Sequence, residues 1–233
     1  MAAEFLLVLQ ARMGSARLPG KVLALLDGQP LLVHCVRRLA AAGAGPVVVA
    51  TTTAAADDPV CEAAARAGAW VHRGPEVDVL ERFRQVLARW PVPCIVRATA
   101  DNPAVDPDSV HRVGAALAAG ADYAVEQGLP TGATVEAVRR DVLMQAAAES
   151  TEPYDREHVT PFVRRRVERF VVRVLDAPAS LNRPDLRFTV DTPADLASMR
   201  QLLHRVGGAT RIVGLAELIA AADTGRHVGT DVA

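Results

Sequence analysis

The first half of the chain alternates short apolar runs with amphipathic helical segments, and this alternation limits the possible folds more than any other feature. Residues 5–9, 47–49 and 94–97 are apolar runs of the buried-strand type, whereas 30–42 and 78–90 carry apolar residues at helical spacing. Strands and helices that alternate in this way form a parallel sheet with helices on both faces. The sequence therefore predicts an α/β fold with a mostly parallel central sheet.

Each of these strands is followed by a polar loop. The loops cover residues 10–21, 50–57 and 98–106. In open parallel sheets, ligands bind beyond the carboxyl ends of the strands, where the strand order switches. We therefore expect the three loops to share one edge of the sheet and to form the binding site.

The second half is less regular. We expect strands at Asp122–Val125, Thr134–Val138, Phe170–Leu175 and Arg187–Val190, and helical character over 139–149 and 155–168. No internal repeat or low-complexity linker divides the chain. We therefore predict a single domain over residues 1–222, with its second half forming an appended lobe, and a flexible tail over residues 223–233, which carry Gly, Asp and Thr.

Composition excludes several function classes. The formal net charge of the 233 residues is −1, which gives no indication of a nucleic-acid partner. No stretch reaches the roughly 18 apolar residues of a membrane span, and no basic segment precedes an apolar run at the N-terminus. We therefore expect a cytoplasmic protein without a membrane-spanning segment.

The strongest chemical pattern lies in the loop over residues 10–21, which places Arg12, Arg17 and Lys21 directly after an apolar strand. Gly14 and Gly20 permit close backbone approach and unusual dihedral angles. Arginine grips two phosphate oxygens at once, while lysine acts as a movable point charge. A triphosphate needs this combination, although a solvated basic loop is the alternative. The glycine spacing fits neither a Walker A loop nor the dinucleotide fingerprint.

The loop resembles the cytidylyltransferases of bacterial surface-sugar synthesis, in particular the spore-coat polysaccharide branch related to CMP-octulosonate and CMP-sialate synthetases. The resemblance covers about residues 5–200. Beside the loop it includes Ala50-Thr51-Thr52, the segment 73–82, Arg97-Ala98-Thr99-Ala100-Asp101-Asn102-Pro103, Val135-Glu136, Arg156-Glu157-His158 and Val190-Asp191-Thr192-Pro193.

This resemblance implies a Rossmann-like nucleotide-binding sandwich of the nucleotide-diphospho-sugar transferase type. It also implies that Asp101 and Asp191 hold Mg²⁺, the cofactor. The residues support this independently, because both aspartates follow apolar strands and two hard carboxylates plus phosphate oxygens suit octahedral Mg²⁺. A turn cap at Asp101 and a helix cap at Asp191, before Thr192-Pro193, are the alternatives.

By the same resemblance, further residues contact the nucleotide. Our candidates are Ala11, Arg12, Gly14, Ser15, Arg17, Lys21, Thr51, Arg73, Asp78 and Thr99, of which Arg12 and Lys21, together with Asp101, are the catalytic candidates. The alternative for Asp78 is that its charge favours the positive start of the helix over 78–90.

The acceptor candidates lie in the second half, where about residues 122–185 are expected to form an acceptor and dimer lobe. They are Glu136, Arg156, Glu157 and His158. A lone histidine is also often a hydrogen-bonded structural residue. The resemblance implies a homodimer built through this half, including residues near 156–166, and a sugar acid or similar hydroxyl compound as acceptor.

The resulting hypothesis is a Mg²⁺-dependent cytidylyltransferase that transfers CMP from CTP to a small hydroxyl acceptor and releases pyrophosphate. One alternative is a glycosyltransferase that uses a nucleotide sugar, for which Asp106-Pro107-Asp108 has the spacing of a metal-binding Asp-x-Asp. A non-catalytic nucleotide-binding module is the other alternative.

Overall fold

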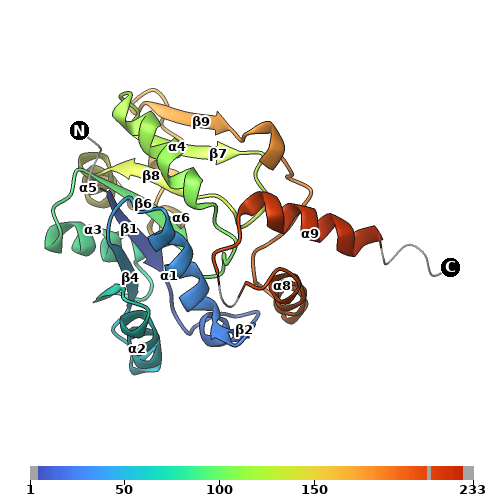
Figure 1. Ribbon diagram of the computed structural model, residues 1–233. Coiled ribbons are helices and arrows are strands. Elements are labelled where there is room, and N and C mark those ends of the chain that lie inside the picture. The colour runs from blue at the N-terminus through green and yellow to red at the C-terminus, as the bar shows by residue number, and fades with distance from the viewer. Residues whose placement is uncertain (1–4, 209–210, 228–233) are drawn as a thin grey trace.

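A single seven-stranded sheet organises the protein, which we describe from a computed structural model covering residues 5–208 and 211–227. Only β8 runs antiparallel to its neighbours, β6 and β7 (Figure 1). The predicted α/β class with a mostly parallel sheet is therefore confirmed. In sheet order the strands are β5 (Trp70–Gly74), β4 (Val47–Thr52), β1 (Phe5–Gln10), β6 (Cys94–Thr99), β8 (Glu136–Arg139), β7 (Tyr123–Gln127) and β9 (Val172–Asp176).

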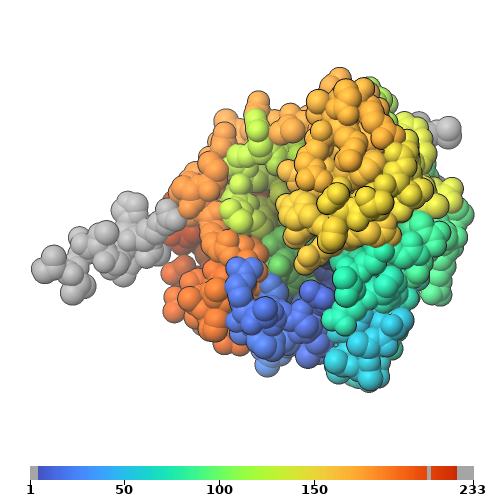
Figure 2. Space-filling view, turned by 180° about the vertical axis from the view of Figure 1, so that it is seen from behind, coloured from blue at the N-terminus to red at the C-terminus, as the bar shows by residue number. Residues whose placement is uncertain are grey.

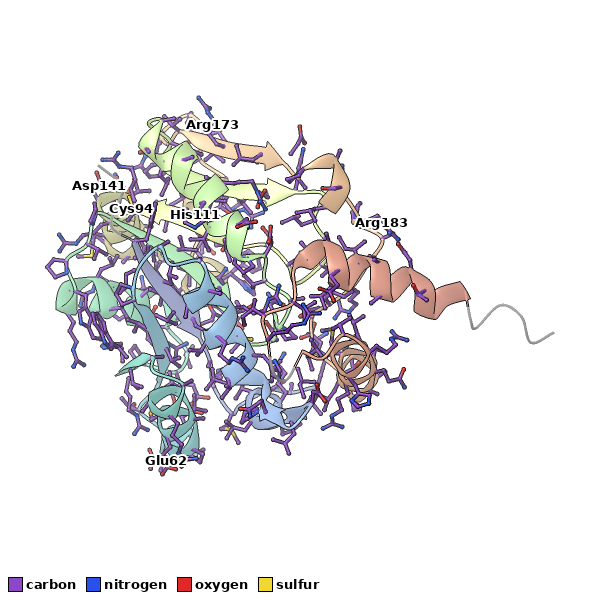
Figure 3. All side chains as sticks on the ribbon, viewed as in Figure 1. Glu62, Cys94, His111, Asp141, Arg173 and Arg183 are labelled. Carbon is purple, nitrogen blue, oxygen red and sulfur yellow. The ribbon has the colours of Figure 1, made fainter. Side chains whose placement is uncertain are left out.

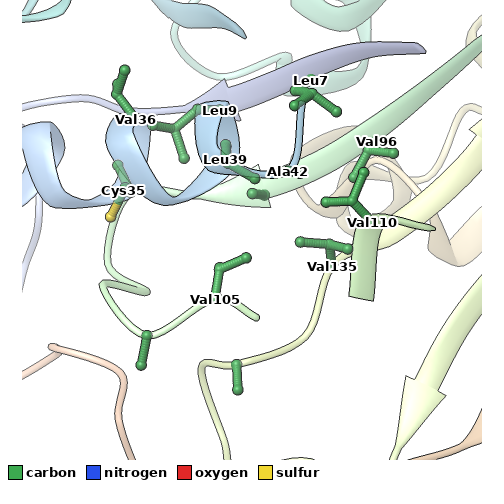
Figure 4. Packing of buried hydrophobic residues seen from close by; sticks show 14 of the residues in the cluster. Leu7, Leu9, Cys35, Val36, Leu39, Ala42, Val96, Val105, Val110 and Val135 are labelled. Carbon is green, nitrogen blue, oxygen red and sulfur yellow. The ribbon is translucent and has the colours of Figure 1, made fainter. Parts of the chain in front are cut away.

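β1 shows why the apolar runs form the centre of this sheet. Successive side chains of a strand point to opposite faces. Leu7 and Leu9 accordingly belong to one hydrophobic cluster, and Leu6 and Val8 to a second cluster across the sheet, all four fully buried. Figure 4 shows Leu7 and Leu9 packed beside α1 (Leu31–Ala41). A strand buried on both faces needs a continuous apolar run, as the sequence has.

Helices cover both faces of the sheet, as predicted. The first hydrophobic cluster is completed by α1, α2 (Asp58–Arg66), α4 (Pro107–Ala118), α8 (Pro193–Arg205) and α9 (Leu215–His227). The second is completed by α3 (Val79–Arg89), α5 (Arg140–Glu149) and α7 (Pro161–Arg164), and α6 (Pro153–His158) contacts α3. The remaining elements are the hairpin β2 (Leu25–Leu26) and β3 (Gln29–Pro30) and the single turns η1 (Lys21–Leu23), η2 (Ala55–Asp57) and η3 (Ala179–Leu181).

The second half departs from the sequence-based prediction in two places. The helix expected over 155–168 is divided into α6 and α7 by Val159, which adopts a positive φ of 74° that ends the first helix. The segment Arg187–Val190 is not a strand of the sheet. It crosses two loops instead, where Phe188 N–H donates to Thr131 O at 2.8 Å and Val190 N–H to Asp101 O at 2.8 Å. Apolar runs therefore mark burial here rather than sheet pairing.

The C-terminal boundary also differs from the prediction. The tail predicted from residue 223 begins inside α9, which continues to His227. Asp223 accepts a hydrogen bond from Arg183 at 2.7 Å, and Figure 3 shows Arg183 beside this helix. Residues 228–233 of the predicted tail lie outside the described residues. In the described ranges, no helix has the length and apolar character needed to cross a membrane.

The topology brings the three predicted loops together. β1 lies between β4 and β6 and runs parallel to both, so the loops that follow these strands leave the sheet at the same edge. The strand order also reverses beside β1, because β4 and β5 continue to one side and β6 to the other. This is the position at which open α/β sheets bind ligands.

Candidate active site

A cleft of about 440 Å³ opens at this edge of the sheet. Figure 2 shows the face that carries it, hollowed where the blue first loop, the green centre of the chain and the yellow second half meet. The loop after β1 contributes the largest share of the wall, with further residues from α3, β6 and the residues after it, α6 and the segment before α8. The lining consists of Gln10, Ala11, Arg12, Gly14, Ser15, Ala16, Arg17, Lys21, Val22, Val79, Arg82, Arg97, Thr99, Ala100, Asp101, Glu157, His158 and Asp191.

The first loop is held in shape by its backbone and by one buried carboxylate. Gly20 N–H donates to Met13 O at 3.0 Å, and Gly20 takes a φ of 71°, which glycine adopts without strain. Met13 N–H donates to Asp57 Oδ1 at 2.6 Å, and Asp57 is only 3% exposed. The expected unusual dihedral is therefore found at Gly20, whereas Gly14 does not have a positive φ.

Lys21 lies between the two aspartates that the sequence paired. Its Nζ donates to Asp101 Oδ2 and to Asp191 Oδ1, both at 3.0 Å, and to the Val190 carbonyl at 2.9 Å. The two carboxylates come from residues 90 positions apart, yet they share one cation. Lys21 is also the only lysine in the chain. A compact ammonium therefore sits where two hard oxygen donors converge.

Further cations surround Asp191. Arg17 Nη2 lies 2.8 Å from Asp191 Oδ1, and Arg187 Nη2 lies 2.7 Å from Oδ2. Partial burial alone would raise the pKa of Asp191, but Lys21, Arg187 and Arg17 outweigh it and lower this pKa. Asp191 is therefore ionised at neutral pH. It does not cap α8, because Thr192 accepts from Asp195 N–H in a capping box with Asp195. The helix-cap alternative for Asp191 is excluded.

Asp101 is oriented by the end of β6. Thr99 Oγ1 donates to Asp101 Oδ1 at 2.5 Å and accepts from Asn102 Nδ2 at 2.8 Å. Thr99 lines the cleft, and its hydrogen bond directs one oxygen of Asp101 while the other oxygen accepts from Lys21.

Three predicted nucleotide contacts, Thr51, Arg73 and Asp78, lie outside the cleft. Thr51 is fully buried within β4, and its hydroxyl has no hydrogen-bond partner among the residues that the structure describes. Arg73 donates to the carbonyls of Thr52 at 2.8 Å and Ala54 at 2.7 Å and pairs with Asp58 at 2.6 Å. The sequence could not reveal these partners of Arg73. The end of β5 brings the residue to the sheet edge, where the carbonyls of Thr52 and Ala54 lie beside it. Arg73 thus fixes the loop after β4 rather than lining the cleft.

Asp78 and Arg156 join two helices instead of lining the cleft. Asp78 caps α3 by accepting Glu81 N–H at 2.9 Å, as the alternative reading of this residue expected. Its second oxygen accepts from Arg156 Nε at 2.6 Å, while Arg156 Nη1 donates to Ala147 O and Ser150 O. This pair holds α6, and with it Glu157 and His158, over the cleft.

Glu136 is a buried anchor rather than an exposed acceptor contact. Glu136 is 8% exposed, and its carboxylate receives hydrogen bonds from Arg97, Tyr123 at 2.6 Å and Thr160 at 2.9 Å. Burial would raise the pKa of Glu136, but Arg97 and the hydrogen bonds lower it. All of its oxygens are engaged, so Glu136 positions Arg97, which does line the cleft.

The sequence analysis missed Arg82, Arg97 and Gln10 as lining residues. Arg97 Nε donates to Gln10 Oε1 at 3.1 Å, which links neighbouring strands β6 and β1. Both residues lie in the C-terminal parts of strands that lead into predicted site loops, and this position was the available signal. Arg82 lies on a helix with a clear amphipathic stripe and gave no such signal.

The Asp-x-Asp spacing does not form a metal site. Asp106 is 4% exposed and pairs with Arg112 at 2.5 Å, and Asp108 lies in the first turn of α4. Neither residue lines the cleft. The structural basis of the glycosyltransferase alternative is therefore removed.

The sequence matches known proteins over most of its length. Residues 6–218 match the model of the cytidylyltransferase family. The spore coat polysaccharide biosynthesis protein SpsF of Bacillus subtilis (strain 168) is 34% identical over 88% of this chain and 88% of that protein. The 3-deoxy-manno-octulosonate cytidylyltransferase of Sodalis glossinidius is 33% identical over 49% of this chain and 46% of its own.

Solved structures share the fold at lower sequence identity. A cytidylyltransferase from Leptospira borgpetersenii superposes with a TM-score of 0.86 at 22% identity, covering 99% of this chain and 98% of that one. A CMP:2-keto-3-deoxy-manno-octonic acid synthetase, solved with CTP, superposes with a TM-score of 0.69 at 19% identity over 88% of this chain and 100% of that one. The predicted Rossmann-like nucleotidyltransferase fold is thereby confirmed. The family model matches residues 6–218, a range that includes every residue that lines the cleft. The chain therefore belongs to the cytidylyltransferase family and is a CTP-dependent nucleotidyltransferase.

Proposed function

We propose that this enzyme transfers CMP from CTP to a hydroxyl group of a sugar acid or a similar small acceptor, with Mg²⁺ as cofactor and pyrophosphate as the leaving group. The observation that carries the proposal is the pair Asp101 and Asp191, which hold one ammonium between them at 3.0 Å each. Two carboxylates facing one cation beside a cationic loop suit a metal–triphosphate complex.

The donor atoms fit Mg²⁺. Magnesium is usually bound by one or two carboxylates and completes its octahedron with water and substrate phosphates. Asp101 and Asp191 offer these carboxylates, and the three hydrogen bonds of the Lys21 ammonium mark the place as favourable to a cation. Bound there, Mg²⁺ would neutralise phosphate charge and polarise the bonds at the α-phosphorus.

The chain's own residues then act by position and charge. Arg12, Arg17 and Lys21 neutralise the triphosphate and stabilise the charge that develops on the leaving pyrophosphate. Lys21 is suited to this because its flexible stem lets the ammonium turn from the carboxylates to the phosphates. Asp57 holds the backbone of this loop in place by accepting a hydrogen bond from Met13 N–H.

The acceptor is expected at the side of the cleft that the second half covers. Glu157 and His158 line the cleft there, and Arg97 adds a cation whose charge attracts a carboxylate. A sugar acid offers both hydroxyls and a carboxylate. The relatives are consistent with this class, because one is a spore coat polysaccharide protein and another a 3-deoxy-manno-octulosonate cytidylyltransferase.

The test is a pyrophosphate-release assay with CTP and a panel of sugar acids and neutral sugars, with and without Mg²⁺. We expect release only when CTP, Mg²⁺ and an acidic sugar are all present. Mass spectrometry should show the acceptor joined to CMP. Turnover in the presence of a chelator, or transfer of a sugar from a nucleotide sugar, would contradict the proposal.

We also propose that the enzyme acts in the cytoplasm as a homodimer formed through its second half. Support comes from the exposed apolar side chains of that half. They include Tyr154 at 57%, Val167 at 69% and Val174 at 53% exposure. A second copy would remove this surface from water.

A further inference from the structure

The turn between α6 and α7 is strained at a residue that directly follows the cleft wall. Val159 has a φ of 74° and a ψ of −55°, and across it Thr160 N–H donates to His158 O at 2.9 Å. These values describe a γ-turn of the rare, strained form. A positive φ is especially unusual for a β-branched residue. His158, the residue before Val159, lines the cleft.

The sequence requires a break in the helix here, but it does not require a strained one. Pro161 begins α7, and proline lacks the N–H group that a continuing helix needs, so α6 cannot run on through it. Glycine at position 159 would adopt a positive φ without strain. Valine adopts it only if the surrounding structure holds the turn, and strain held in this way is concentrated at functional sites.

Contacts on both sides of the turn hold it. Val159 is 0% exposed and belongs to the hydrophobic cluster that α3 and α5 complete, and its N–H donates to Asp155 O at 2.9 Å. Thr160 is 1% exposed, and its hydroxyl donates to Glu136 at 2.9 Å. Glu136 in turn pairs with Arg97, which lines the cleft. The position of the turn is therefore fixed relative to the cleft.

The turn reverses the chain immediately after the residues that α6 contributes to the cleft. Glu157 and His158 are exposed and line the cleft on the side where we place the acceptor. A backbone relaxed to a negative φ at residue 159 would change the direction of the chain beside His158 and displace both side chains. A displacement of about 1 Å in a catalytic site costs up to roughly a hundredfold in rate.

We propose that Val159 is a positioning residue, whose strained turn sets His158 against the acceptor; this rests on the proposed transfer of CMP to an acceptor bound at that side of the cleft. The backbone conformation does the positioning, and the buried valine side chain holds the conformation. Alanine would keep the strain of a positive φ and lose the packing that holds it. Glycine would lose the same packing but needs no hold, because it adopts the turn without strain.

The test compares Val159→Gly with Val159→Ala, and Val163→Ala is the matched control. Val163 is also 0% exposed and belongs to the same cluster, but it lies within α7. Pyrophosphate release is measured with the sugar acid that gives the highest wild-type turnover in the panel above. Val159→Ala should raise KM for this acceptor about tenfold or more with KM for CTP little changed. Val159→Gly and Val163→Ala should keep the acceptor KM close to wild type.

This order separates positioning from packing. If the side chain of Val159 served only to fill the core, glycine would be the more damaging substitution, because it removes more of the side chain. Urea unfolding without any substrate gives a second readout of the same contrast. Val159→Gly should have a higher urea midpoint than Val159→Ala, whereas Val163→Gly should have a lower midpoint than Val163→Ala, since glycine is favoured at a positive φ and disfavoured in a helix.

A variant at the exposed His158 keeps the inference testable if Val159→Ala fails to fold. His158→Ala should raise the acceptor KM about as much as Val159→Ala, and the double variant should raise it little further, because both changes remove one interaction. A wild-type acceptor KM in His158→Ala, or a higher acceptor KM in Val159→Gly than in Val159→Ala, overturns the role of Val159. A wild type that releases no pyrophosphate with CTP and any acceptor would instead overturn the proposed function.

Discussion

At the scale of single residues, the chemistry depends on where a few charges meet. Lys21 is the only lysine among 26 basic residues, and it lies between the two carboxylates expected to bind metal. An arginine at this place would bring a wide planar fork instead of a compact charge that can turn between partners. The residue type, and not only its charge, should therefore matter.

We predict that Lys21→Arg and Lys21→Ala each lower turnover roughly a hundredfold or more, because each removes a movable charge that stabilises the transition state. Steady-state pyrophosphate release measures this effect, with Arg66→Ala as a matched control on the exposed face of α2. Arg66 pairs with Glu62 at the surface, and its loss should leave turnover unchanged. Normal turnover of Lys21→Arg would show that any cation suffices.

The two aspartates allow a second test. Asp101→Asn and Asp191→Asn should each abolish Mg²⁺-dependent turnover with the fold retained, because each removes a negative charge facing the cation. Asparagine keeps the size of the side chain, and the cap of α8 is supplied by Thr192 and Asp195. Circular dichroism checks the fold, and calorimetric titration of Mg²⁺ with CTP present checks the metal. Near-normal turnover of both variants would exclude them as metal ligands.

At the scale of elements, the start of α8 explains how Asp191 is freed for chemistry. Asp195 accepts the N–H groups of Asp191 and Thr192, both at 2.9 Å, and pairs with Arg187 at 3.1 Å. The helix therefore caps itself, and the Asp191 side chain is left to face Lys21 and Arg17.

The same cap predicts a pH dependence. Partial burial would raise the pKa of Asp195, but Arg187 and the N–H groups of Asp191 and Thr192 lower it to about 2. A lowered pKa stabilises the fold above the unfolded value of 3.8, and this contribution is lost as the pH falls from about 4 towards 2. Asp195→Asn should cost about 2 kcal/mol at pH 7. Urea unfolding at pH 7, 4 and 3 measures the free energy of unfolding of both proteins. The difference between the variant and wild type should become smaller as the pH falls, whereas a constant difference would exclude the ionisation of Asp195 as its cause.

At the scale of the whole molecule, the sheet has two unlike ends. The β5 end lies beside α3, whose Val79 and Arg82 line the cleft, whereas β9 at the other end pairs with β7 alone among the described strands. Val174 in this edge strand is 53% exposed, and exposed apolar edge strands invite pairing with another chain.

We predict a homodimer whose contact includes this end. Light scattering at micromolar concentration should give twice the 24.7 kDa mass of the chain. Val174→Lys should shift the population towards monomer, because a charge at the contact opposes burial. Val77→Lys is the control, since Val77 is 83% exposed at the other end of the sheet. A wild-type monomer at this concentration would exclude the dimer.

Much of the fold could be predicted from the sequence, because the periodicity of apolar residues indicates directly which residues are buried. The strand run at Phe5–Leu9 and the helical stripe over 78–90 were placed correctly, and parallel topology then brought the loops to one edge. The pairing of Asp101 with Asp191 followed from the resemblance. The strand-end argument holds for Asp101, which follows β6, but not for Asp191, because the strand expected at Arg187–Val190 is not part of the sheet.

Only the tertiary structure determined the role of each polar side chain in and around the cleft. Glu136 and Arg156 have the residue types of a binding site, but buried partners satisfy them, and their hydrogen bonds come from segments far away in the chain. Arg82, in contrast, lies on an amphipathic helix, and the structure places it in the cleft wall with no ion pair to a carboxylate among the described residues. Periodicity specifies which face of an element is buried. Whether a buried charge is paired depends on long-range packing, which no local pattern encodes.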